Sequence, residues 1–371
     1  MNILQTPVRF YPFIGGVENY VYHLSEELVK MGHQVKVICA NEPHSQTEEV
    51  INNIEVERLP YIAKIANTNL TPTLPFKIQG EDFDILHTHL PTPWTADWSA
   101  FYAKLKGKPL VLNYYNDIVA SGAASNIASL YNKTFLKFLL KQADRIIIIQ
   151  EDYIKTSPYL SKYADKVRVV PVGVDVDRFK PLNVETEKNS IFFLSLLDDY
   201  HLYKGLDYLL KSIKIVKEEI EDIKLIVGGK GTLLEHYKSM AESLGIQDNV
   251  QFHGFIPEDE IVAYYNRCQI FALPSISSAQ EGFGIVALEA LACEKPVITT
   301  EIVGVSDEIG KEGLGAIVPP KDADALAEGI VKLLSSPNLQ EMGEKGRAVV
   351  EDKFTWKRVA MLTDEIYKEL I

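Results

Sequence analysis

Short, almost wholly apolar runs alternate with longer stretches of helical periodicity along this chain, and the alternation occurs twice. Typical runs are Val35–Ala40, Arg145–Gln150 and Ile270–Leu273, which are rich in β-branched residues. Runs of this kind are typical of strands buried on both faces, and helices between them favour right-handed crossovers and parallel sheets. The chain is therefore predicted to be an α/β protein with two doubly wound domains that face each other across a cleft.

A polar segment separates the two rounds of alternation. Phe179–Asn189 contains a proline followed mostly by polar residues, as is typical of a linker. We therefore predict one Rossmann-like domain over residues 1–180 and a second over 181–355. Residues 356–371 are predicted to form a C-terminal helix that packs back on the first domain. Ligands of doubly wound sheets bind beyond the carboxyl ends of the strands, so the loops there are the places to seek chemistry.

The remaining predicted elements follow the same pattern. The other predicted strands are Ile85–His87, Leu110–Asn113, Val167–Val170, Ser190–Ser195, Lys224–Gly228, Val250–His253 and Pro296–Thr299. The predicted helices are Val17–Met31, Thr92–Lys106, Leu130–Gln142, Gly205–Glu219, Thr232–Leu244, Pro257–Arg267, Gly284–Ala292, Ala323–Ser335 and Pro337–Phe354.

The charge of the chain is unevenly distributed. The 371 residues carry 38 Lys and Arg against 51 Asp and Glu, a net charge of −13. Residues 1–180 hold 19 of each sign and are neutral, so the whole excess lies in 181–371. An acidic total argues against a nucleic-acid binder, because phosphate binding needs a basic face that releases counterions.

The sequence shows neither a secretory signal nor a membrane span. Met1–Gln5 has no cationic start followed by an apolar core, and no run approaches roughly 18 apolar residues. Cys39, Cys268 and Cys293 each lie among apolar residues, which predicts buried thiols in a reducing compartment. We expect a cytoplasmic protein whose membrane contact, if any, is peripheral at the inner face of the cell membrane.

A pair of glycines opens the first predicted helix. Gly15 and Gly16 precede Val17 and follow Tyr-Pro-Phe-Ile. Paired glycines let backbone amides approach a phosphate closely, and the helix N-terminus adds partial positive charge. The pair matches neither a Walker loop nor the three-glycine dinucleotide fingerprint, so a tight structural turn remains the alternative.

A stronger motif lies in the second half of the chain. A predicted strand ends at Leu273, a polar loop carries Glu281, and a helix that contains Glu289 starts at Gly284. One carboxylate could accept hydrogen bonds from sugar hydroxyls and the other from a ribose diol, with the helix N-terminus facing a diphosphate. Helix capping or a solvated surface is the alternative for both glutamates.

With these motifs the sequence resembles the retaining nucleotide-sugar glycosyltransferases of family 4, which have the two-domain GT-B fold. The resemblance covers nearly the whole chain. It is carried by Gly15–Glu18, Val170–Asp175, Phe179–Pro181, Lys204-Gly205, Val227–Gly231 and the block from Glu281 through Glu289 to Val297.

The resemblance implies roles for the matching residues. Lys204 would hold the donor diphosphate, Glu281 the sugar and Glu289 the ribose. Gly16 would contact the phosphate or sugar, and the backbone at Phe255 would lie near the base. The donor-binding set so implied is Gly15, Gly16, Lys204, Phe255, Glu281, Gly282, Phe283, Gly284 and Glu289.

The chain departs from the family pattern before Lys204. The family usually places an Arg a few residues earlier, and the two cations neutralise the leaving diphosphate. Here the loop has no Arg, and His201 is the natural substitute because it could donate to phosphate whether neutral or charged. An ordinary loop histidine is the alternative.

A second departure lies at Tyr115, where the family pattern has a His near the transferred sugar. A tyrosine can donate a hydrogen bond to a sugar hydroxyl, but it cannot act as an imidazole. Asp117, two residues on, is a candidate for orienting the acceptor hydroxyl, with a helix cap or turn as the alternative. The candidate catalytic set is Lys204, Glu281, His201, Tyr115 and Asp117.

Two histidines end a predicted strand. We expect His87 and His89 to point to opposite faces, a poor arrangement for binding one metal, and no Cys or carboxylate set of metal-ligand spacing accompanies them. We therefore expect no metal, and we place His89 in the lining of the acceptor cleft.

Three lysines recur at helical spacing in Leu130–Gln142. Lys133, Lys137 and Lys141 form either a solvated basic stripe or a patch that meets anionic lipid headgroups. Such clusters gain roughly 1 kcal/mol per residue near a membrane surface. Lys104, Lys106 and Lys108 in the same predicted domain could add to the patch.

The expected function is hexose transfer of mannose or glucose type, without a metal. The donor would be a UDP- or GDP-sugar held mainly by the second domain, and the acceptor a lipid-linked intermediate, lipid or glycan held mainly by the first. The resemblance implies retention, and because no N-terminal carboxylate stands out as a nucleophile, same-face transfer is the mechanism consistent with the family. The alternatives are an inactive donor-binding partner subunit, favoured by the missing Arg and His, and a GT-B sugar-nucleotide epimerase.

Overall fold

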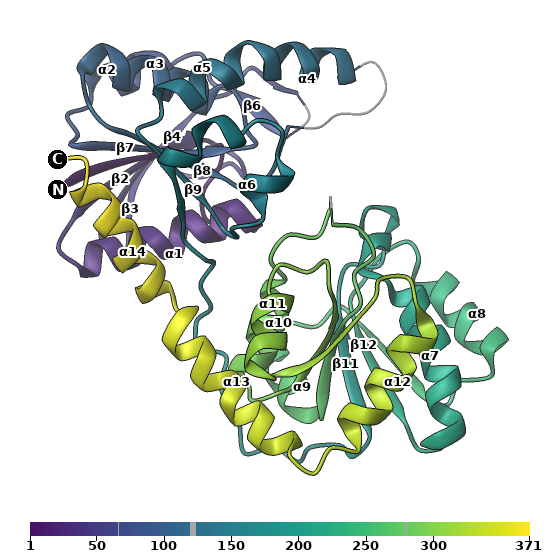
Figure 1. Ribbon diagram of the computed structural model, residues 1–371. Helices are drawn as coiled ribbons and strands as arrows, with labels where there is room; N and C mark the ends of the chain where they lie inside the picture. Colours follow the sequence, from purple (N-terminus) through teal and green to yellow (C-terminus); the bar gives the residue numbers. More distant parts are fainter. Residues whose placement is uncertain (66, 119–123, 279) are drawn as a thin grey trace. The chain divides into compact units, whose positions relative to one another are not determined.

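The computed structural model describes residues 1–65, 67–118, 124–278 and 280–371 (Figure 1). The chain divides into two compact units. Unit 1 comprises Met1–Gly173 and Trp356–Ile371, and unit 2 comprises Val174–Thr355. The C-terminal segment therefore groups with the first unit, and the first crossing between units falls a few residues before position 180.

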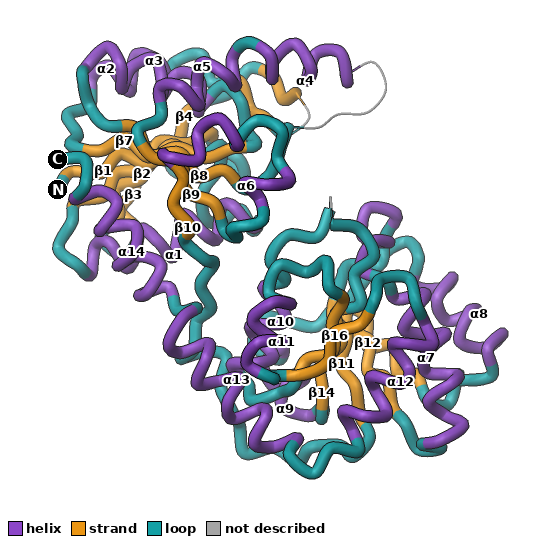
Figure 2. Tube along the Cα trace, in the orientation of Figure 1, coloured by secondary structure: helices purple, strands orange, loops and turns teal. Residues whose placement is uncertain are grey.

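Unit 1 is built on a sheet of strand order β10-β9-β8-β7-β1-β2-β4-β3 (Figure 2). Every strand pair in this sheet is parallel apart from β3 with β4. Beside the sheet, β5 (Ala63–Ile65) pairs antiparallel with β6 (Thr68–Leu70). The strands of the sheet are β1 (Asn2–Thr6), β2 (Gln34–Ala40), β3 (Glu48–Ile51), β4 (Ile54–Leu59), β7 (Ile85–Leu90), β8 (Leu110–Tyr114), β9 (Arg145–Ile148) and β10 (Val167–Val169).

Helices cover both faces of this sheet. In Figure 1, α2, α3, α5 and α4 lie along one face, whereas α1 and α14 lie on the other. Leu86, Leu112 and Ile146 of the sheet and Leu139 of α5 belong to one buried apolar core. The helices of unit 1 are α1 (Gly16–Lys30), α2 (Leu74–Gly80), α3 (Thr95–Lys106), α4 (Ala124–Lys133), α5 (Phe135–Gln142), α6 (Tyr153–Thr156), the 3-10 helix η1 (Ser161–Lys166) and α14 (Trp356–Lys368).

Unit 2 is built on an entirely parallel sheet of order β13-β12-β11-β14-β15-β16. Its strands are β11 (Ser190–Leu194), β12 (Lys224–Gly228), β13 (Val250–Gly254), β14 (Ile270–Leu273), β15 (Val297–Thr300) and β16 (Gly315–Val318). Its helices are η2 (Asp199–Lys204), α7 (Leu206–Glu219), α8 (Leu234–Leu244), α9 (Ile261–Arg267), α10 (Ile285–Ala292), α11 (Ser306–Glu312), α12 (Ala323–Leu334) and α13 (Leu339–Lys353).

Two predicted segments differ in the structure. The helix predicted over Leu130–Gln142 is divided at Thr134, whose backbone (φ −118°, ψ −77°) separates α4 from α5. The predicted linker Phe179–Asn189 is part of unit 2. Phe179 is buried against Tyr265, and the backbone N–H of Leu182 donates to Asn266. Burial of one aromatic ring and specific hydrogen bonds thus attach a polar, proline-containing segment to a domain.

Candidate functional site

The site in unit 2 follows from the strand order. Strands β11 and β14 are neighbours at the centre of the sheet, and the chain continues outward from them in opposite directions. Such a switch point leaves a crevice at the carboxyl ends of the two strands, because the connections leave on opposite sides. The loop after β11 carries Lys204, and the loop after β14 carries Glu281. The topology therefore brings the loops that carry the two predicted residues to one edge.

Lys204 and Glu281 form a largely buried ion pair. The Nζ atom of Lys204 lies 2.8 Å from Oε2 and 3.1 Å from Oε1 of Glu281. The hydroxyl of Ser275 donates to the same Oε2 atom. Glu281 is buried, and Lys204 is partly buried. A cation and a carboxylate so placed can hold an anionic group and a sugar hydroxyl next to each other.

A close backbone approach makes this pairing possible. Gly205 has φ +76°, and a Cβ atom built on it would lie 2.1 Å from the carbonyl oxygen of Pro274. The N–H of Ile276 donates to the carbonyl of Tyr203 at 2.7 Å, which ties the two loops together. Only glycine combines this conformation with this approach.

His201 is held by a neighbouring carboxylate. Its Nδ1 lies 2.7 Å from Oδ1 of Asp198, which also accepts the N–H groups of Tyr200 and His201 and so caps η2. The hydrogen bond from His201 lowers the pKa of Asp198. Since Nδ1 donates to the carboxylate, Nε2 can donate to a phosphate only when the ring is charged.

The turn before α10 presents backbone N–H groups. The carbonyls of Gly282 and Phe283 accept hydrogen bonds from Gly304 and Val305. No described residue accepts the N–H of Phe283 or Gly284. Gly284 has φ +86°, and a Cβ atom there would lie 2.6 Å from a methyl carbon of Val303. These two N–H groups are therefore available at a helix N-terminus, the arrangement that suits an anion or a sugar oxygen.

Glu289 lies on α10 and contacts a buried tyrosine. Its Oε2 accepts the hydroxyl of Tyr265 at 2.7 Å. Burial raises the pKa of Glu289 to about 7, partly offset by this hydrogen bond. Tyr265 comes from α9 and was not among the predicted site residues, because its apolar surroundings in the sequence indicate only a core position.

Phe255, predicted to lie near the base, is exposed directly after β13. The ammonium of Lys230, on the loop after β12, lies 4.4 Å from the centre of its ring. The sequence motif Val227–Gly231 contained this lysine, but no role followed from it. The structure places Lys230 at the carboxyl edge that also carries Lys204 and Glu281.

In unit 1 the glycine pair starts α1 beside a buried ion pair. Nε of Arg9 lies 3.0 Å from Oε1 of Glu18, and both side chains are buried. A Cβ atom on Gly15 would lie 2.3 Å from Oε2 of Glu18, whereas one on Gly16 would have no described atom within 4 Å. A side chain at position 15 would therefore press on the carboxylate of this ion pair, whereas Gly16 faces open space. Arg9 was not predicted, since a lone arginine carries no motif.

His87 and His89 lie on the same face of β7, so the prediction of opposite faces is wrong. Residues i and i+2 of a strand share a face. Their ring centres are 4.7 Å apart, and both side chains are fully buried. His87 contacts the hydroxyl of Tyr367 and Oδ1 of Asn113, each at 2.7 Å. Burial lowers the pKa of His87 to about 4, and it also holds the pKa of His89 well below its usual range.

His89 and Tyr115 lie together inside unit 1. Nδ1 of His89 is 3.2 Å from the hydroxyl of Tyr115, and its Nε2 is 2.9 Å from Gln5. Asp117 lies elsewhere in its loop, where it accepts the hydroxyls of Tyr114 and Ser157, each at 2.7 Å. The structure thus joins His89 with Tyr115 but gives Asp117 separate partners.

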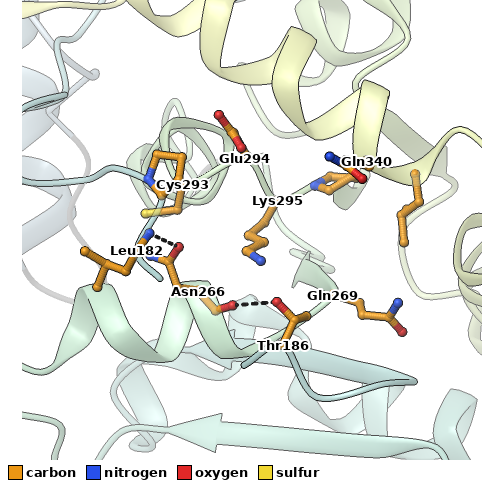
Figure 3. A pocket seen from close by; sticks show the side chains of 11 residues that line it. Leu182, Thr186, Asn266, Gln269, Cys293, Glu294, Lys295 and Gln340 are labelled. Atoms are coloured by element: carbon orange, nitrogen blue, oxygen red, sulfur yellow. Dashed lines mark hydrogen bonds between the residues drawn. The ribbon is translucent and has the colours of Figure 1, made fainter. Parts of the chain in front are cut away.

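A pocket of about 400 Å³ lies at the opposite edge of the sheet in unit 2 (Figure 3). Gln269 and Pro296, which line it, directly precede β14 and β15. The pocket is therefore at the amino ends of the strands, away from Lys204 and Glu281. Lys295 extends into it, and Asn266 accepts the N–H of Leu182 through Oδ1.

Metal and membrane features were sought in the described part of the chain. It holds no group of three or more His, Cys, Asp or Glu side chains that could bind a metal ion. None of its helices is both long and apolar enough to cross a bilayer. The three cysteines are free and buried, as predicted.

Two family models match adjoining parts of the chain. The model of the group 1 glycosyl transferases matches residues 176–349, and that of glycosyltransferase family 4 matches residues 14–178. The chain belongs to the group 1, family 4 glycosyltransferases. The matches contain every predicted site residue of this glycosyltransferase, from Gly15 to Glu289.

Similar proteins span the whole glycosyltransferase. The O-antigen chain mannosyltransferase C of Escherichia coli is 27% identical, over 96% of this chain and 95% of its own. The phosphatidyl-myo-inositol mannosyltransferase of Mycobacterium leprae is 25% identical, over 95% and 93%. The structure of Anabaena HepE in complex with UDP-glucose superposes with a TM-score of 0.72 at 17% identity, covering all of both chains. The fold is therefore GT-B, as predicted.

Proposed function

We propose that this glycosyltransferase transfers a hexose of mannose or glucose type, without a metal, from a UDP- or GDP-sugar to a lipid-linked, lipid or glycan acceptor. Unit 2 binds the donor and unit 1 the acceptor. The names of the mannosyltransferase relatives and the UDP-glucose bound by the Anabaena protein support the sugar and donor classes. The transferred sugar keeps its anomeric configuration.

The observation that carries this proposal is the Lys204–Glu281 pair at the switch point of unit 2. The N–H groups of Phe283 and Gly284, which no described residue accepts, belong to the same loop as Glu281. In this site the diphosphate displaces part of the pairing between Lys204 and Glu281, and Glu281 then accepts from a sugar hydroxyl. Lys204 and Glu281 carry opposite charges on adjoining loops. Such a pair suits a nucleotide sugar, in which an anionic diphosphate is joined to a sugar with hydroxyl groups.

Catalysis in this proposal consists of positioning and charge stabilisation. As the bond from the sugar to the diphosphate breaks, negative charge grows on the leaving phosphate. Lys204, charged His201 and the helix N-terminus at Gly284 stabilise that charge. The leaving phosphate takes the proton from the incoming acceptor hydroxyl on the same face of the sugar.

Replacing either member of the pair tests the assignment. Lys204→Met and Glu281→Gln should each lower turnover at least about tenfold, because each removes an interaction at the centre of transfer. Turnover is measured by release of nucleoside diphosphate from a panel of UDP- and GDP-sugars. Lys211→Met, an exposed change on α7, is the matched control. Wild-type rates in both site variants would refute the assignment.

The donor class is tested independently of the acceptor. A nucleoside diphosphate or nucleotide sugar that binds the folded protein stabilises it by mass action and so raises its melting temperature. When the ligand concentration is 100 times the dissociation constant, the gain in unfolding free energy is about 2.7 kcal/mol. We expect a shift with UDP or GDP and with one of their sugars. The shift should shrink in Lys204→Met, and no shift with any nucleotide would contradict a donor site in unit 2.

A further inference from the structure

One outer surface of unit 1 combines exposed apolar and basic side chains. It is formed by α3, α4 and α5, which lie next to one another on the same face of the sheet (Figure 1). Its apolar members are Phe101, Leu105, Leu130, Phe135 and Phe138, whose exposed fractions run from 36% to 64%. Its lysines are Lys104, Lys133, Lys137 and Lys141, all exposed. We call this surface the outer helical face.

Specific contacts show that these side chains adjoin one another. The ammonium of Lys104 on α3 lies 5.9 Å from the ring centre of Phe138 on α5. The ring of Phe135 stacks on Tyr131 of α4 at 5.9 Å. Tyr131 in turn donates its hydroxyl to Asp97 of α3 at 2.7 Å. The three helices therefore present one continuous surface.

The positive charge of this face is not neutralised locally. Residues 95–142 contain six lysines but only two carboxylates, Asp97 and Asp117. Asp97 accepts from Tyr131 and from the backbone of Trp94, and Asp117 accepts from Tyr114 and Ser157. In the described part of the chain, the four lysines of the outer helical face have no carboxylate partner. Such a basic surface attracts anionic partners even though the chain as a whole carries a net charge of −13.

We propose that the outer helical face docks on an anionic phospholipid bilayer. The lysines meet headgroup phosphates, and the Phe and Leu side chains enter the boundary with the acyl chains. The long apolar stems of lysine suit this mixed environment, and helices that lie in an interface have this composition. The inference rests on the proposed lipid or lipid-linked acceptor, because docking brings unit 1 to the surface where such an acceptor lies.

Vesicle co-sedimentation of the full chain tests the docking itself. Vesicles of phosphatidylcholine alone are compared with vesicles that contain 30 mol% phosphatidylglycerol, in about 0.05 M and about 0.5 M salt. We expect at least about tenfold tighter partitioning to the anionic vesicles in low salt. High salt should weaken it, because the screening length falls well below that at low ionic strength. Equal binding to both vesicles, or none to either, would overturn the proposal.

Two test sets of variants, each with a matched control set, locate the face. Replacing Lys133, Lys137 and Lys141 together by Gln should reduce partitioning at least about tenfold, whereas the same change at Lys214, Lys311 and Lys332, exposed lysines of unit 2, should not. The double variant Leu105→Gln with Phe135→Gln leaves the charge of the protein unchanged. It should reduce the vesicle binding that remains in high salt. Val50→Gln with Ile62→Gln, on β3 and before β5, is the matched apolar control. Equal losses in test and control sets would overturn the assignment.

Two further measurements separate this proposal from its rivals. The melting-temperature shift with nucleotide, measured without vesicles, should be unchanged in all four sets, so a missing shift in the wild type speaks against the donor site rather than against docking. Sedimentation velocity tests whether the face joins two copies of the chain. A dimer that Leu105→Gln with Phe135→Gln abolishes would overturn the bilayer as its occupant.

Discussion

One titratable side chain in each unit, His87 in unit 1 and Glu289 in unit 2, makes a pH-dependent contribution to stability, and the two contributions have opposite sign. Burial lowers the pKa of His87 to about 4, so its contribution to stability is present above pH 6.5 and lost as the pH falls towards 4. Burial raises the pKa of Glu289 to about 7, so its contribution is present below pH 4.5 and lost as the pH rises through 7. Each residue thus costs stability in its charged form, so a fall in pH removes the contribution of His87 and a rise in pH removes that of Glu289.

Glu289→Gln isolates the second effect. Glutamine keeps an acceptor for the Tyr265 hydroxyl but cannot ionise, so the variant should gain stability relative to the wild type as the pH rises from 5 to 8. The expected gain is roughly 1–3 kcal/mol. Chemical unfolding at several pH values measures it, with Glu242→Gln on exposed α8 as the control. A difference between variant and wild type that does not change with pH would contradict the assignment.

Some candidate residues of the site could be predicted from the sequence, and others could not. Lys204 and Glu281 were predicted because each lies in a motif with a known spacing. Arg9, Lys230 and Tyr265 were not, because each becomes a candidate only through a neighbour distant in sequence. No local pattern can reveal a partner that the chain brings in from another strand or helix.

Among the elements, the loops after β11 and β14 depend on one glycine. Gly205→Ala would place a Cβ atom against the carbonyl of Pro274 at positive φ. We expect a loss of roughly 1–3 kcal/mol and at least about tenfold lower turnover, since relief of the clash moves Lys204 from Glu281.

Gly245→Ala is the matched control for this change. Gly245 also has positive φ, +70°, at the end of α8, but no described atom lies within 4 Å of its would-be Cβ. The Gly245→Ala variant should lose roughly 1 kcal/mol of unfolding free energy and keep the turnover of the wild type. Melting temperature and turnover of the two variants are compared. Equal turnover in both would show that the close approach does not position the site.

The elements show which sequence patterns were informative. Short apolar runs predicted β12 and β14 to the residue. The short strand β1 was missed because Gln5 and Thr6 look polar, although both are buried. Gln5 contacts His89 of β7, and the Thr6 hydroxyl donates to the carbonyl of His87 in the same strand. The division of one helix into α4 and α5 was missed because the apolar spacing continues through Thr134. The periodicity of apolar residues predicts which positions are buried. It does not predict buried positions that are polar, nor a helix end that falls within a continuous apolar face.

At the scale of the whole molecule, the C-terminal helix is part of the unit that the N-terminal half of the chain forms. Helix α14 belongs to unit 1, where the hydroxyl of Tyr367 contacts His87, Asp364 pairs with His33 at 3.0 Å, and Trp356 packs edge-on to Tyr20. The chain therefore crosses from unit 1 to unit 2 and returns, and the first unit is incomplete without its last sixteen residues, 356–371.

Tyr367→Phe tests this long-range tie. The change leaves Nδ1 of buried His87 without its partner, so it should cost roughly 1–3 kcal/mol of unfolding free energy. Urea unfolding measures the loss, and Tyr200→Phe, at an 82% exposed position in unit 2, should cost nothing measurable. Equal stability of Tyr367→Phe and wild type would show that the contact contributes nothing.

By itself the sequence determined the parallel α/β class and the glycosyltransferase family, and through the family resemblance it predicted Lys204 and Glu281 as candidate site residues, because strand burial and loop motifs are local properties that neighbouring residues express together. Only the tertiary structure decided which groups those residues contact. It placed the hydroxyl of Tyr367 against His87 and that of Tyr265 against Glu289, and it joined the lysines and phenylalanines of three helices into one face. Those outcomes depend on strand order and helix packing, which bring together residues that no sequence spacing connects.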